Sequence, residues 1–271
     1  MFPARPDFED VTLEKVLSNL ADRALAAAKT ALAIRFAGAD FAYATGSIMR
    51  GEGTAWSDID LVVVFPSLER AWRESFVQEG FPVEAFVNDP ETLAYYLGRD
   101  AESGCPIMVN MVATGTILGV DVEKAGAIQA EAAKLLAAGP TPLAGPSYES
   151  LLYLVTDLAD DLRGERPRGE VAAIAAQLYQ KLADLTLLGR GAWTGRGKWA
   201  PRLLGRLDAD LAEAFETAFR LAAQGEGAQL LALADRELAL HGGRFFDGYR
   251  QEAPLEARRV GSQDGVQPTP G

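Results

Sequence analysis

The sequence contains few of the residues that form cross-links or bind soft metals. Its 271 residues include a single cysteine, Cys105, and a single histidine, His241. One cysteine cannot form an intramolecular disulfide, and one cysteine with one histidine cannot complete a zinc site of the Cys/His type. Any metal ion must therefore be held by oxygen ligands.

The sequence also lacks a long apolar run and an excess of basic residues. No stretch approaches the roughly 20 apolar residues that span a membrane, and the first ten residues hold acids but no apolar signal segment. We therefore expect a cytoplasmic protein without a membrane partner. Acidic residues outnumber basic residues by 38 to 26, a net charge of −12. A broad phosphate-binding surface is not expected at this charge, which disfavours nucleic acid as a partner.

A stretch rich in glycine and proline, residues 139–146, separates two halves with different hydrophobic patterns. Before it, short apolar runs alternate with helical periodicity; after it, the periodicity is almost all helical. The pattern predicts an α/β (α+β) N-terminal domain with a small mixed sheet over residues 1–140 and an all-α helical bundle over 147–250. We expect the polar tail, 252–271, to be disordered.

The expected elements follow from apolar spacing, β-branched runs and capping residues. In the first half we expect helices over 11–36 and 91–97 and strands over 41–45, 58–65, 81–87 and 116–120, with a glycine-rich loop over 46–56. In the second half we expect helices over 148–163, 171–189, 208–223 and 227–240.

Two aspartates stand at the start of the most apolar of these strands. Asp58 and Asp60 are two residues apart, so on a strand their side chains point to the same face. Two adjacent carboxylates repel each other, and a divalent cation with oxygen ligands, normally Mg²⁺, relieves that repulsion. Upstream, Gly46 and Ser47 follow another strand, where backbone N–H groups and a hydroxyl can hold phosphate oxygens.

A third acid, Glu84, lies in the middle of the apolar strand expected over 81–87. An acid among apolar neighbours is costly unless it faces a site. The sequence therefore predicts that the phosphate-binding residues and the metal-binding acids face the same cleft.

The Gly46-Ser47 pair, the run from Ser57 to Asp60 and the acid in the following strand resemble the polymerase-beta-type nucleotidyltransferase superfamily. Within that superfamily, they resemble in particular the small antibiotic (aminoglycoside) nucleotidyltransferases. The motif covers residues 39–88, and the order of an α/β domain before a helical bundle extends the likeness to about residue 250.

The resemblance implies transfer of a nucleoside monophosphate, AMP from ATP being the first expectation, to a hydroxyl of a small molecule such as an aminoglycoside-like antibiotic. Asp58, Asp60 and Glu84 would bind two Mg²⁺ ions, with Glu84 as ligand, general base or both. Gly46 and Ser47 would bind phosphates. An acidic surface suits a polycationic acceptor.

Two further residues, Ser57 and Lys198, lie in sequence motifs that indicate a role less specifically. Ser57 would contact the nucleotide or orient the aspartates, or else simply close a turn. Lys198, in a glycine-rich basic segment of the second half, would reach the triphosphate as a point charge.

Two alternatives stay open. The same fold could modify a protein or RNA, or the chain could be a non-catalytic nucleotide-binding or antitoxin-like module.

Overall fold

A computed structural model of the chain describes residues 13–54 and 56–258. The chain divides into two compact units. The first takes the chain up to Thr141 together with the returning segment Gly191–Arg196, and the second takes Pro142–Arg190 and the chain from Gly197 onward. Within the described residues, none of the helices combines the length and the apolar character needed to cross a membrane.

The first unit is built on a five-stranded mixed sheet with the strand order β3-β4-β2-β1-β5. Its strands are β1 (Phe41–Thr45), β2 (Ile59–Val64), β3 (Trp72–Gln78), β4 (Phe81–Asn88) and β5 (Thr116–Gly119). β2 and β4 are parallel neighbours, and every other neighbouring pair is antiparallel. The middle strand, β2, and its neighbour β1 are almost entirely buried, as their apolar sequences predict.

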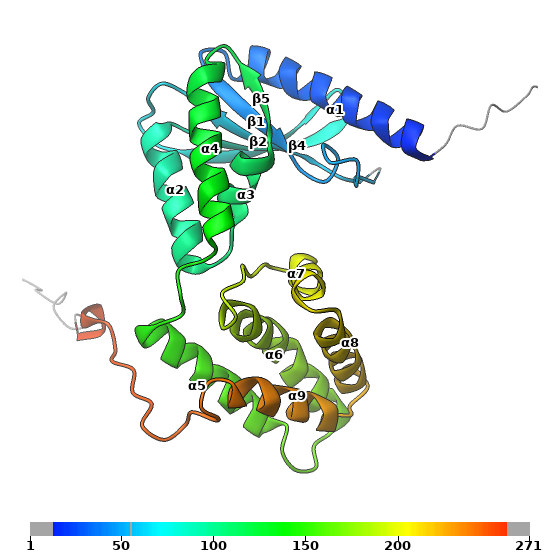
Figure 1. The fold of residues 1–271 in the computed structure, drawn as a ribbon, viewed down its shortest axis with the longest axis vertical. Coiled ribbons are helices and arrows are strands. Elements are labelled where there is room, and N and C mark those ends of the chain that lie inside the picture. The colour runs from blue at the N-terminus through cyan, green and yellow to red at the C-terminus, as the bar shows by residue number, and fades with distance from the viewer. Residues whose placement is uncertain (1–12, 55, 259–271) are drawn as a thin grey trace, which may run out of the picture. The chain divides into compact units, whose positions relative to one another are not determined.

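Helices cover both faces of this sheet (Figure 1). On one face lies α1 (Leu13–Arg35), whose alanines at positions 24, 27, 28 and 31 are fully buried and allow close approach to the sheet. On the other face lie α2 (Pro90–Ser103), α3 (Ile107–Thr114) and α4 (Val122–Ala138). Asp89 caps α2: its carboxylate accepts a hydrogen bond from the Thr92 backbone at 2.8 Å.

The second unit is helical. It contains α5 (Gly145–Asp161), α6 (Arg168–Leu188), α7 (Trp199–Leu207), α8 (Ala209–Ala223) and α9 (Ala228–Ala239), followed by a short 3-10 helix, Leu255–Arg258. The mixed α+β first half and helical second half confirm the predicted fold class.

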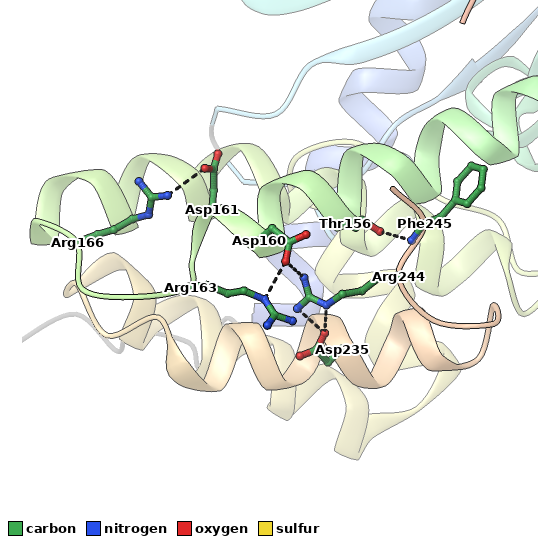
Figure 2. A network of polar contacts seen from close by, with 8 residues as sticks. All are labelled: Thr156, Asp160, Asp161, Arg163, Arg166, Asp235, Arg244 and Phe245. Atoms are coloured by element: carbon green, nitrogen blue, oxygen red, sulfur yellow. Dashed lines mark hydrogen bonds and ion pairs between the residues drawn. The ribbon is translucent and has the colours of Figure 1, made fainter. Parts of the chain in front are cut away.

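An arginine after α9 ties the end of this unit to its helices (Figure 2). The Arg244 guanidinium pairs with Asp160 on α5 and, at 2.5 Å, with Asp235 on α9. The next residue, Phe245, donates its backbone N–H to the buried Thr156 hydroxyl at 3.0 Å. These contacts anchor the segment that follows α9 against α5.

Besides the 3-10 helix, four elements of the described chain were not expected from the sequence: β3, α3, α4 and α7. α3 is a short apolar run of eight residues, a length at which strand and helix are hard to distinguish. The tail 252–271 was expected to be disordered. The structure describes its first residues, 252–258, which include the 3-10 helix. Residues 259–271 lie outside the described part of the chain. The start of the first expected helix, residues 11 and 12, also lies outside it.

Candidate active site

Three carboxylates converge at one end of β2 and β4. Asp60 is the second residue of β2 and lies in register with Glu84 on the parallel neighbour β4, so both side chains leave the same face of the sheet. Asp58 comes immediately before β2 rather than on it. Each of the three acids offers an oxygen within 4.8 Å of the others.

A glycine is required beside these acids. Gly46 follows β1 directly and has a backbone φ of +108°, a conformation that side chains strongly disfavour. A Cβ at this position would lie 3.1 Å from Oδ2 of Asp60 and 3.2 Å from the backbone oxygen of Asp58. A side chain at position 46 would therefore crowd the Asp60 carboxylate and the backbone of Asp58.

The loop between β1 and β2 is held by its own serines. The Ser47 hydroxyl donates to the Ser57 hydroxyl at 3.0 Å, and Ser57 Oγ also accepts from the Thr54 backbone N–H at 2.9 Å. The Glu52 backbone N–H donates to the Ser47 carbonyl oxygen at 3.0 Å. These bonds place both serine hydroxyls at the base of the loop, next to Gly46 and Asp58 in the chain.

The acid cluster is partly open to solvent. Asp58 is exposed, while Asp60 and Glu84 are half-buried. Three carboxylates this close repel one another, and a bound cation would offset that repulsion. An all-oxygen, carboxylate-rich donor set fits a hard cation such as Mg²⁺ or Mn²⁺ and does not fit a soft metal.

A basic residue that the sequence did not single out contacts this cluster. Arg73, on β3, forms an ion pair with Oε1 of Glu84. Arg73 was missed because β3 itself was not predicted. The sequence of β3 alternates weakly, and each of its residues is exposed or half-buried. The sequence signal that could have found β3 is Gly80, a turn residue just before the apolar strand over 81–87. In the structure, Glu79 and Gly80 have positive φ and form the turn between β3 and β4.

The structure brings together the predicted site residues of the first unit: Gly46, Ser47, Ser57, Asp58, Asp60 and Glu84. Lys198 belongs to the second unit, where it is exposed and occupies the N-cap position of α7.

Comparison with known proteins points to the same segment. The family model described as nucleotidyltransferase domain matches residues 29–98, which include β1, β2, β4 and all three acids. This match supports an enzyme that transfers nucleotidyl groups. No protein of curated function matches the chain.

Among solved structures, one similar chain is a nucleotidyltransferase-like protein from Exiguobacterium sibiricum 255-15. It is 14% identical, with a TM-score of 0.42, and the match covers 80% of this chain and 76% of that one.

Proposed function

We propose that this protein is a Mg²⁺-dependent nucleotidyltransferase that moves a nucleoside monophosphate, AMP from ATP in the first instance, onto a hydroxyl of a small molecule. The observation that carries the proposal is the convergence of Asp58, Asp60 and Glu84 beside the close approach of Gly46. This arrangement lies within the segment that matches the nucleotidyltransferase domain.

The three carboxylates would hold two Mg²⁺ ions, with Glu84 as metal ligand, general base or both. When bound, Mg²⁺ supplies positive charge where the phosphates develop negative charge. The Ser47 hydroxyl and the backbone beside Gly46 would bind the outer phosphates. Ser57 bonds to Ser47 and would keep that hydroxyl in place.

The chemistry is an in-line displacement. The acceptor oxygen attacks the α-phosphorus and forms a new P–O bond, while the bond from that phosphorus to the bridging oxygen breaks. Pyrophosphate leaves with the electron pair, and the hydroxyl proton passes to a carboxylate oxygen such as that of Glu84. The protein residues therefore bind, orient and accept a proton.

An aminoglycoside-like polycation is the acceptor class that we propose first, because the chain carries a net charge of −12. Lys198 is proposed to contact the triphosphate. Replacing Lys198 with alanine should then raise the KM for the nucleotide more than it lowers kcat.

Pyrophosphate release tests the proposal. The four common nucleoside triphosphates are incubated with Mg²⁺ and a panel of hydroxylated acceptors that includes aminoglycosides, sugars, a protein mixture and RNA. Release that requires Mg²⁺ and an acceptor, and that Asp60→Asn abolishes, supports the proposal. If pyrophosphate is released only with protein or RNA, the acceptor is of that class and not a small molecule. Nucleotide binding without release under any condition identifies a non-catalytic nucleotide-binding module.

A further inference from the structure

The edge strand β3 places an arginine, Arg73, beside Glu84. β3 pairs with β4 so that Ser75 lies opposite Glu84, and Arg73 lies opposite Phe86. Because side chains alternate along a strand, Arg73 and Glu84 share one face as diagonal neighbours. This is the face on which Asp60 also lies.

Arg73 is held from two directions. Its guanidinium pairs with Oε1 of Glu84, and its Cζ lies 4.9 Å from the centroid of the Phe86 ring. The Glu84 side chain is 24% exposed and that of Arg73 is 59% exposed. The Phe86 ring attracts the guanidinium, and the ion pair of the guanidinium with Oε1 favours one orientation of the Glu84 carboxylate.

We infer that Arg73 is a positioning residue for the metal site: it holds Glu84 in the orientation in which its carboxylate meets Asp58 and Asp60. The inference rests on the proposed function, because it assigns the acid cluster to a divalent cation. It adds a residue of β3 to the set on which metal binding depends.

Arg73 can affect the affinity of the site for a metal ion in two opposite directions, so a measurement of that affinity tests the inference. As a positive charge, Arg73 repels a cation, so charge alone predicts that its removal tightens metal binding. As a positioning group, it preorganises a ligand, and loss of such outer-shell partners weakens metal binding about 10- to 100-fold. The direction of the change therefore distinguishes the two roles.

The experiment measures binding of Mn²⁺ alone to the full chain by electron paramagnetic resonance, without nucleotide. Arg73→Ala should weaken binding about tenfold, and Arg73→Lys, which keeps the charge but loses the planar fork, should lie between. Arg35→Ala is the matched control. Arg35 pairs with Glu74 of β3 at 2.5 Å and stacks on Phe76 at 4.3 Å, but on the opposite face of the sheet.

A double-mutant cycle with Glu84→Gln separates positioning from a general effect on folding. If Arg73 acts through Glu84, Arg73→Ala should change Mn²⁺ binding less than twofold in the Glu84→Gln background. Unchanged or tighter binding by Arg73→Ala overturns the inference, as does an equal loss in both backgrounds. In either case, the proposed function still stands if the wild type binds Mn²⁺ and Asp60→Asn abolishes that binding. Absence of saturable Mn²⁺ binding to the wild type overturns both.

Discussion

Replacing Gly46 with alanine tests how tightly the backbone and the acids are packed. The new methyl carbon would lie 3.1 Å from Oδ2 of Asp60 and 3.4 Å from its backbone nitrogen. Contacts this short require the carboxylate or the loop to move by a few tenths of an ångström. The positive φ of +108° adds backbone strain, because a side chain disfavours it.

The size of the effect follows from these two costs. Strain of about 1–2 kcal/mol from the backbone and crowding of about 1–2 kcal/mol predict a loss of about 2–4 kcal/mol in the free energy of unfolding. A misplacement of about 1 Å costs about 100-fold in rate, so a displacement of a few tenths of an ångström should lower kcat/KM by about tenfold. The measurements are urea unfolding and pyrophosphate release at saturating Mg²⁺.

Gly51→Ala is the matched control in the same loop. Gly51 also has a positive φ, +71°, but a Cβ there would meet nothing within 4 Å. It should cost about 1 kcal/mol in unfolding free energy and leave kcat/KM within threefold of the wild type. The reasoning is refuted if both variants behave alike, or if Gly46→Ala retains full activity.

Three further predictions concern stability. Burial raises the pKa of Asp100 to about 6, above its value in the unfolded chain. Ionisation of Asp100 therefore lowers the stability of the fold as the pH rises from about 4 to 6. Asp100→Asn should raise the free energy of unfolding by about 1 kcal/mol at pH 7–8 and by less at pH 4.5, measured by urea unfolding. Burial, with the Arg190 charge, lowers the pKa of His241, whose Nδ1 lies 2.8 Å from the Tyr148 hydroxyl. Stability should therefore fall as pH drops below about 6.5, and His241→Gln should reduce that slope in thermal scans from pH 7.5 to 5.5. Arg244→Met should lower the free energy of unfolding by about 1–2 kcal/mol, and an unchanged urea midpoint would contradict the anchoring role of its two ion pairs.

Much of the first unit could be predicted because its central strands are strongly apolar. β1 was predicted with its observed bounds, and the Asp89 cap of α2 was predicted from its sequence. α4 was missed because its alanines give little contrast between a buried and an exposed face: only Ala125 and Ala132 are buried. The return of Gly191–Arg196 to the first unit depends on tertiary contacts, such as the 2.8 Å bond from the Trp193 indole to the Leu136 carbonyl.

The acids of the candidate site were selected from the sequence because a charged residue in an apolar strand costs free energy unless it faces a site. Their grouping depends on strand pairing, since the register of Asp60 with Glu84 exists only when β2 and β4 are parallel neighbours. The contact of Arg73 with Glu84 likewise depends on a strand pairing, the antiparallel pairing of β3 with β4. Spacing along the chain carries no information on either register.

Thermal unfolding with and without ligands tests the central claim most directly. The wild type and Asp58→Asn/Asp60→Asn are heated with each nucleoside triphosphate, with and without Mg²⁺, because a ligand that binds only the folded state raises the Tm. We predict a rise in Tm that requires both Mg²⁺ and nucleotide in the wild type and is lost in the double variant. No rise with any nucleotide at millimolar concentration, or an equal rise in the double variant, would contradict the assignment of this acid cluster to metal and nucleotide.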